Sequence, residues 1–104
     1  MFADRSVHGL LAMTGGSGGN RMLPLVDYES IRRYPKFLGG FSDLTALINA
    51  VHARTGLVTF HAPLGVSEWN AFSVDQFKRT VMSAEAFTLA NSKPEGDALA
   101  TREG

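Results

Sequence analysis

The sequence predicts an α/β fold in which a small parallel sheet is flanked by helices. Short apolar runs suited to buried strands alternate with segments of helical periodicity, an order typical of parallel α/β domains. Glycine-rich stretches follow two of these runs, at residues 14–21 and 39–40. Ligands of such folds bind beyond the carboxyl ends of the strands. Both stretches can therefore face one site.

The composition limits the classes of function. The 104 residues suffice for one small domain, and a hydrophobic content of 44% suits a packed core. Ten basic and ten acidic residues cancel, so we expect neither nucleic acid nor a membrane as a partner. Cysteine is absent, which fits a reducing cytoplasm and excludes thiolate metal sites; we expect no metal and no cofactor. No segment reaches the roughly 18 apolar residues of a membrane span.

The first predicted strand is the apolar run 7–13, which we expect to be buried. It leads into the glycine loop 14–21, whose backbone N–H groups can face an anion. This loop lacks the Lys-Ser/Thr of a P-loop and the spacing of a dinucleotide-binding loop. Two interpretations stay open for it: a flexible surface connection, or a backbone wall for a substrate carboxylate or an oxyanion.

Two short helical segments are expected next. Residues 22–26 form an apolar turn interrupted by Pro24, and Asp27 caps a helix over 28–33 that Pro35 ends.

The stretch 35–47 organises the predicted fold. It combines a short buried strand, a sharp turn at Gly39-Gly40 and the start of a helix, which places Ser42 at the tip of a strand and at the positive end of a helix. Nucleophilic hydrolases use this geometry, and the N–H groups that begin at Asp43 can stabilise an oxyanion. The alternative is a structural turn with a Ser-Asp helix cap, since Leu44 replaces the second glycine of G-x-S-x-G.

The helix after this turn is well specified. Its apolar residues recur at helical spacing, and Gly56 provides a stop signal. The apolar residues are Leu44, Leu47, Ile48 and Val51.

The rest of the chain predicts three further elements. Residues 57–61 form a β-rich run, and the S-x-x-Q capping box at Ser73 opens a helix with an apolar face. Residues 86–91 resemble a last short strand, and the polar segment 93–104 a linker. At the end of the run 57–61, His61 is a candidate for a catalytic role or a hydrogen-bonded structural histidine; His52 is expected on the polar face of its helix.

Five sequence blocks in order carry a resemblance. They are GGSGGNRMLP (15–24), DY (27–28), PK (35–36), GFSDLTAL (40–47) and TGLVTFHAP (55–63). Together they resemble the N-terminal half of LD-carboxypeptidases, the muramoyltetrapeptide carboxypeptidase family of serine peptidases, which also includes microcin-C immunity peptidases. The resemblance implies a truncated flavodoxin-like domain, similar to the N-terminal domain of class I glutamine amidotransferases.

The resemblance also implies a function and a set of site residues. The expected enzyme is cytoplasmic, acts in murein recycling and removes the terminal D-alanine from a murein tetrapeptide. The serine of the family's G-[YF]-S-D motif corresponds to Ser42, the nucleophile. The backbone N–H of Asp43 would form part of the oxyanion hole, and the glycine loop would supply the rest through Gly16, with Gly15 as the other candidate. Gly15 and Ser17 belong to the substrate loop.

Two departures from the family pattern bear on substrate preference. Ser17 and Gly19 stand where the family has Tyr and Ser in Gly-Gly-Tyr-Gly-Ser, and Ala62 replaces the glycine of His-Gly-Pro.

The family's Ser-Glu-His triad takes its Glu and His from a C-terminal domain. The resemblance therefore implies that residues 1–92 are a partial, nucleophile-bearing domain and that 93–104 lead toward a C-terminal domain absent here. The expected partners are that domain, the murein peptide and a second copy in a homodimer. His61 and Glu68 are conceivable substitutes for the missing partners, although no family motif supports them. Without a base, Ser42 is a weak nucleophile, so we expect the chain alone to be nearly inactive.

Two other functions remain as alternatives. One is an immunity-type peptidase that acts on a peptidyl-nucleotide. The other is a non-catalytic binding or dimerisation module that keeps the fold and the glycine loop.

Overall fold

A three-stranded parallel sheet forms the centre of the fold in the computed structural model, which describes residues 1–88. Its strands are β1 (Gly9–Leu11), β2 (Phe37–Gly40) and β3 (Phe60–His61), in the order β1-β2-β3. Leu10 pairs with Leu38 of the central strand, and Gly39 pairs with Phe60 on the other side. The predicted α/β fold with a small parallel sheet is confirmed.

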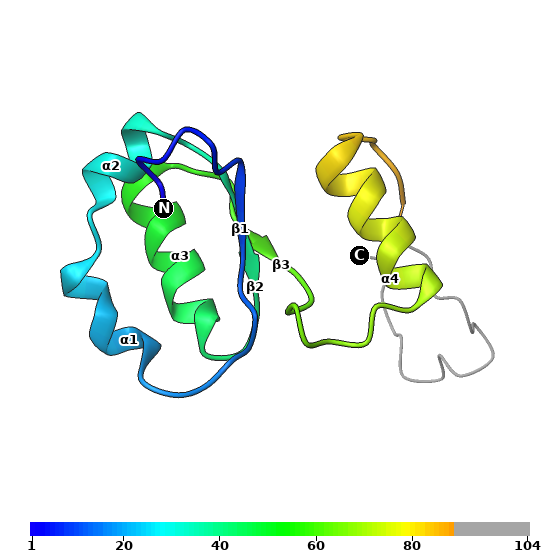
Figure 1. The fold of residues 1–104 in the computed structure, drawn as a ribbon, viewed down its shortest axis with the longest axis horizontal. Coiled ribbons are helices and arrows are strands. Elements are labelled where there is room, and N and C mark those ends of the chain that lie inside the picture. Colours follow the sequence, from blue (N-terminus) through cyan, green and yellow to red (C-terminus); the bar gives the residue numbers. More distant parts are fainter. Residues whose placement is uncertain (89–104) are drawn as a thin grey trace.

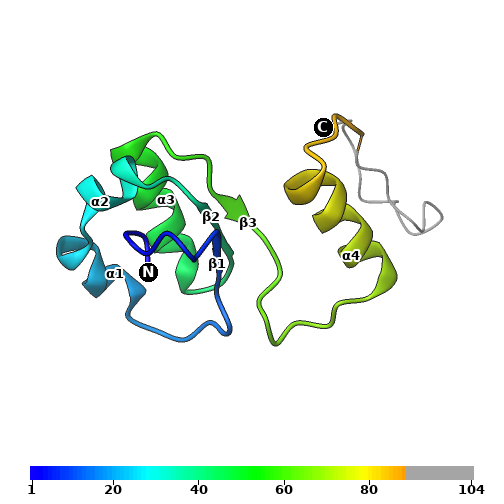
Figure 2. The same ribbon diagram turned by 45° about the horizontal axis from the view of Figure 1, so that its top comes forward.

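The helices lie on both sides of this sheet. They are α1 (Gly19–Met22), α2 (Tyr28–Arg33), α3 (Leu44–Thr55) and α4 (Ala71–Phe77), with a 3₁₀ turn η1 (Leu23–Leu25) after α1 and a π-helical turn η2 (Lys78–Met82) after α4. Figures 1 and 2 show α1, α2 and α3 gathered on one side of the sheet, while α4 lies on the other side beyond β3. Among the described residues, no helix has both the length and the apolar character needed to cross a membrane.

The core lies between β2 and the helices α2 and α3. Its buried residues are Ile31, Leu38, Ile48 and Val51, and Leu44 and Leu47 pack against them. The predicted apolar face of α3 is therefore confirmed. So are two helix ends: Asp27 accepts a hydrogen bond from the N–H of Ser30 at the start of α2, and Gly56 ends α3 with a φ of 75°.

The strands are shorter than predicted, and β1 is not buried. The run 7–13 forms a strand only over Gly9–Leu11, and Leu11 is 38% exposed because β1 lies at the edge of the described sheet. In the run 57–61 only the last two residues pair with β2. Thr59 is instead hydrogen-bonded to α3, because its hydroxyl donates to the carbonyl of Ile48 at 3.1 Å.

Two helix starts also differ from the predictions. The segment 14–21 is not all loop, because α1 begins at Gly19, before the predicted turn at 22–26. The capping box predicted at Ser73 is wrong as well: α4 begins three residues earlier than predicted, at Ala71, and the side chain of its N-cap Asn70 accepts from the N–H of Ser73. Asparagine and serine are about equally good N-cap residues, so local capping preference does not decide between Asn70 and Ser73.

The last predicted strand is not formed where it can be examined. Residues 86–88 are not in a strand, and 89–91 lie outside the described residues, as does the linker predicted over 93–104. The domain boundary expected at residue 92 likewise lies outside them.

Candidate active site

The turn between β2 and α3 holds Ser42 in an unusual backbone conformation. Its φ is 62°, in the left-handed region that residues with a Cβ rarely occupy. The side chain is exposed, and the Ser42 carbonyl accepts from the N–H of Thr45 at 3.0 Å in the first turn of α3. A strained serine between a strand and a helix has the geometry of a nucleophile elbow. The predicted strand-turn-helix geometry is confirmed, whereas the catalytic role of Ser42 stays a prediction.

Gly40 makes this sharp turn possible. Its φ is 154°, and a Cβ at this position would lie 2.4 Å from a methyl group of Leu44 and 2.9 Å from the Cβ of Ala12. Only glycine combines this backbone conformation with so close an approach.

The chain closes over the end of β2 where that strand leaves the sheet. The N–H of Gly65 donates to the carbonyl of Ala12 at 2.8 Å, and the N–H of Val66 donates to the carbonyl of Met13 at 3.0 Å. The segment after β3 thereby reaches the continuation of β1. These bonds fix the start of the glycine loop.

The glycine loop lies against Ser42. A Cβ on Gly15 would lie 2.8 Å from Oγ of Ser42 and 3.9 Å from the backbone nitrogen of Asp43. A side chain at position 15 would therefore displace the serine. The prediction that the glycine loop and Ser42 face one site agrees with this contact.

The two N–H groups predicted for the oxyanion hole are available. Within residues 1–88, neither the Asp43 N–H nor the Gly16 N–H has a hydrogen-bond acceptor. Gly16 is exposed, with a φ of 154° and nothing within 4 Å of where a Cβ would stand, and Ser17 beside it is exposed as well. Such donors can bind a developing oxyanion. Their roles, and the role of Ser17 in the substrate loop, remain predictions.

The side chain of Asp43 has a role that sequence reasoning missed. Its Oδ2 accepts a hydrogen bond from the N–H of Gly19 at 2.8 Å, which joins the elbow to the far end of the glycine loop. The two residues are 24 positions apart, so no local pattern could have paired them.

His61 lies beside the elbow but is not hydrogen-bonded to Ser42. It is exposed at the end of β3, and its ring centroid lies 5.9 Å from that of Phe41. Glu68 is exposed too. In the part of the chain that the structure describes, no hydrogen bond joins the Ser42 hydroxyl to a histidine or a carboxylate. By contrast, His52, which was expected on the polar face of its helix, is exposed, and its Nδ1 lies 2.9 Å from the carbonyl oxygen of Leu57.

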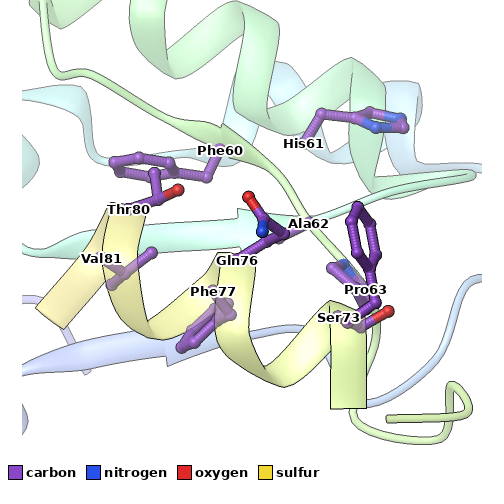
Figure 3. Close-up of a pocket in the computed structure, with 10 residues that line it drawn as sticks. Phe60, His61, Ala62, Pro63, Ser73, Gln76, Phe77, Thr80 and Val81 are labelled. Atoms are coloured by element: carbon purple, nitrogen blue, oxygen red, sulfur yellow. The ribbon is translucent and has the colours of Figure 1, made fainter. Parts of the chain in front are cut away.

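A cavity of about 370 Å³ lies between β3 and α4. Figure 3 shows α4 beside the segment that follows Phe60, with Gln76 and Thr80 directed toward it. Most of the lining is apolar, and Oε1 of Gln76 is buried without a hydrogen-bond partner among the described residues. Neither Ser42 nor the glycine loop lines this cavity. Two of its lining residues contact the elbow: the ring centroid of His61 lies 5.9 Å from that of Phe41, and the N–H of Ala62 donates to the carbonyl of Gly40 at 3.2 Å.

No group of three or more His, Asp or Glu side chains within residues 1–88 is arranged to hold a metal ion. At the elbow, the described residues present the hydroxyl of Ser42 and the N–H group of Asp43.

Comparisons with known proteins agree with this geometry. Residues 1–62 match the family model of the LD-carboxypeptidase N-terminal domain. The chain is 38% identical to a putative carboxypeptidase of Treponema pallidum, over 86% of this chain and 28% of that protein. It is 45% identical to a probable murein peptide carboxypeptidase of Bacillus subtilis, over 62% of this chain and 20% of that protein.

A solved structure has the same fold. The wild-type apo structure of the Microcin C7 self immunity protein MccF matches with a TM-score of 0.75 and 27% identity, over 84% of this chain and 29% of that one. The chain thus spans less than a third of the length of each of these three proteins. The family match over residues 1–62, together with the relatives, shows that the chain belongs to the LD-carboxypeptidase family.

Proposed function

We propose that this chain is the N-terminal, nucleophile-bearing part of a serine LD-carboxypeptidase that removes the terminal D-alanine from a murein tetrapeptide. The observation that carries the proposal is Ser42, exposed at a φ of 62° between β2 and α3, with Gly15 packed against its hydroxyl. The similarity to a probable murein peptide carboxypeptidase supports this choice of substrate. The proposed setting is the cytoplasm, where the resemblance places murein recycling.

The proposed chemistry follows from the groups at the elbow. Oγ of Ser42 attacks the carbonyl carbon of the scissile amide, and the resulting oxyanion accepts from the N–H groups of Asp43 and Gly16. When the tetrahedral intermediate collapses, D-alanine leaves as a protonated amine and the remaining peptide stays esterified to Ser42. Water then hydrolyses this ester and regenerates the serine.

Both steps need a general base, and we assign it to a C-terminal domain that acts as a partner of this chain. The assignment is supported by the Ser42 hydroxyl, which has no histidine or carboxylate as a hydrogen-bond partner in residues 1–88. Losing one triad member lowers the rate by several orders of magnitude. We therefore expect the 104-residue chain alone to release D-alanine at a negligible rate.

A second candidate is an immunity-type peptidase that acts on a peptidyl-nucleotide. The likeness to the Microcin C7 self immunity protein MccF supports it. The same nucleophile and oxyanion donors serve both reactions, so the two candidates differ in substrate and not in the chemistry of Ser42. Side-by-side assays with a murein tetrapeptide and an aminoacyl-sulfamoyl nucleoside as substrates would separate them.

The decisive experiment supplies the missing partner. Residues 1–88 would replace the matching segment of the Bacillus subtilis murein peptide carboxypeptidase, and D-alanine release from a murein tetrapeptide would be measured. We expect turnover by this chimera and a loss of several orders of magnitude in the Ser42→Ala variant. Ser83→Ala, an exposed serine after α4, serves as the matched control and should leave turnover unchanged.

Two results would contradict the proposal. Turnover that survives Ser42→Ala in the chimera would exclude Ser42 as the nucleophile. Release by the isolated chain at the rate of an intact enzyme would show that it holds its own base, and His61 would then be the first residue to test.

A further inference from the structure

The carboxylate of Asp43 does not cap α3, the helix that follows it. Asp43 stands at the N-cap position of α3, where an aspartate commonly accepts from an N–H of the first turn, yet its side chain makes no such bond. Its Oδ2 instead accepts from the N–H of Gly19, the first residue of α1, at 2.8 Å. The acceptor is charged and half-buried, which makes this bond stronger than one between neutral groups.

The fit around this bond requires glycine on the loop side. A Cβ on Gly19 would lie 2.8 Å from the Asp43 carbonyl oxygen and 2.9 Å from Oδ2. At the other end of the loop, Gly15 approaches Ser42 equally closely. The loop therefore lies against two consecutive residues of the elbow: it is hydrogen-bonded to Asp43 at Gly19 and closely packed against Ser42 at Gly15.

Gly16 lies between these two contacts. It is exposed, its N–H has no acceptor within the described residues, and its surroundings are open. Among residues 1–88, no hydrogen bond holds this N–H in place. A glycine-rich segment with two free dihedral angles per residue would otherwise spread over many conformations.

We propose that the Asp43 side chain is a positioning residue: it holds the glycine loop against the elbow, so that the N–H of Gly16 keeps a fixed place beside Ser42. This inference rests on the proposed function, in which that N–H binds the oxyanion. Oxyanion donors must be held to within about 0.5 Å of the productive geometry to be effective. Asp43 would then contribute two groups to the oxyanion hole: its own N–H as a donor, and its carboxylate to position the N–H of Gly16.

The test measures backbone amides and needs no turnover. In ¹H–¹⁵N NMR spectra of the 104-residue chain, the Gly19 amide proton should be shifted downfield by its charged acceptor. Asp43→Ala should move it upfield and speed its hydrogen exchange about tenfold or more, because a bond to a charged acceptor is lost. The amide signals of Gly15 and Gly16 should shift or broaden in the same variant.

Two further variants separate positioning from a general loss of structure. Asp43→Asn keeps an oxygen acceptor, so it should restore most of the Gly19 shift and the sharp Gly16 signal. Gly19→Ala breaks the same contact from the loop side and should reproduce the Asp43→Ala spectrum at Gly16, which keeps the inference testable if Asp43→Ala does not fold. Asp75→Ala, at an exposed aspartate on α4, is the control and should leave all three glycine signals in place.

The inference is overturned if Asp43→Ala folds and leaves the Gly15 and Gly16 signals unchanged. It is overturned as well if Asp43→Asn resembles Asp43→Ala, because the acceptor would then not be what matters. An inactive chimera would count against the proposed function alone, since the amide signals do not depend on catalysis. The two ideas can therefore fail separately.

Discussion

The backbone conformation of Ser42 destabilises the folded chain, and it is explained only by the position of Ser42 at the turn between β2 and α3. A residue with a Cβ in the left-handed region costs about 1–2 kcal/mol, and the site retains the serine at a φ of 62° where glycine would fit without strain. Such strain is common at functional sites because it presents a side chain that a relaxed turn would not. The conformation of Ser42 thus lowers the stability of the fold and exposes the hydroxyl group.

The backbone strain at Ser42 leads to a prediction for this one residue. Ser42→Gly relieves the backbone strain, whereas Ser42→Ala keeps the strain and removes only the hydroxyl. We expect the glycine variant to be more stable than the alanine variant by about 1 kcal/mol, although neither carries the nucleophile. Urea unfolding of both variants measures the difference, and equal unfolding midpoints would mean that the turn at Ser42 stores no strain.

The sequence predicted the residues at the elbow better than the contacts between them. The pattern Gly-Gly-Phe-Ser-Asp was enough to place Ser42 at a strand-to-helix turn, because a local backbone conformation depends on local residue types. The bond from Gly19 to the Asp43 carboxylate was not predictable, since it links positions 24 residues apart and replaces the helix cap that local rules assign to an aspartate.

At the level of elements, the helices built on strong periodicity were predicted correctly. The helix α3 has four apolar residues on one face and a glycine stop, and both features appear in the structure. The strands were predicted too long because apolar runs do not reveal where pairing stops. The start of α4 was misplaced because Asn70 and Ser73 both match capping patterns, and only the packed structure decides between them.

The cap of α2 provides a prediction for pH. Asp27 accepts hydrogen bonds from the hydroxyl and the N–H of Ser30, and the hydroxyl bond is the main reason that the pKa of Asp27 lies below its ordinary value of 3.8. A pKa lowered by folding adds stability above the ordinary value, and this stability is lost as the pH falls through the folded pKa. The cap should therefore weaken in acid below about pH 4.

Comparison with Asp27→Asn isolates this effect. Asparagine is an equally good N-cap and accepts the same bond from Ser30, but it carries no charge to titrate. We expect the unfolding midpoint of the wild-type chain to decrease, relative to that of Asp27→Asn, as the pH is lowered from 5 to 3. Parallel midpoints over this range would show that ionised Asp27 adds nothing to the stability of α2.

At the level of the whole molecule, the edge strand β1 is the feature with a consequence for assembly. In the described sheet β1 pairs with β2 on one side only, and its other side presents unpaired backbone groups. Leu11 is 38% exposed on this strand, and Met13 is 68% exposed directly after it. An exposed apolar edge invites pairing with a second chain.

We therefore propose that the chain self-associates through β1, and we expect light scattering to give a mass above that of a monomer at high concentration. Leu11→Lys should restore the monomer mass, because a charge on an edge strand opposes pairing. Met82→Lys, at a 73% exposed methionine after α4, makes the same change away from the edge and should leave the association intact.

If both variants reduce the association equally, the chains associate through general apolar contact and β1 has no special part in it. A monomeric mass for the wild-type chain at high concentration would exclude self-association of this chain, through β1 or through any other surface.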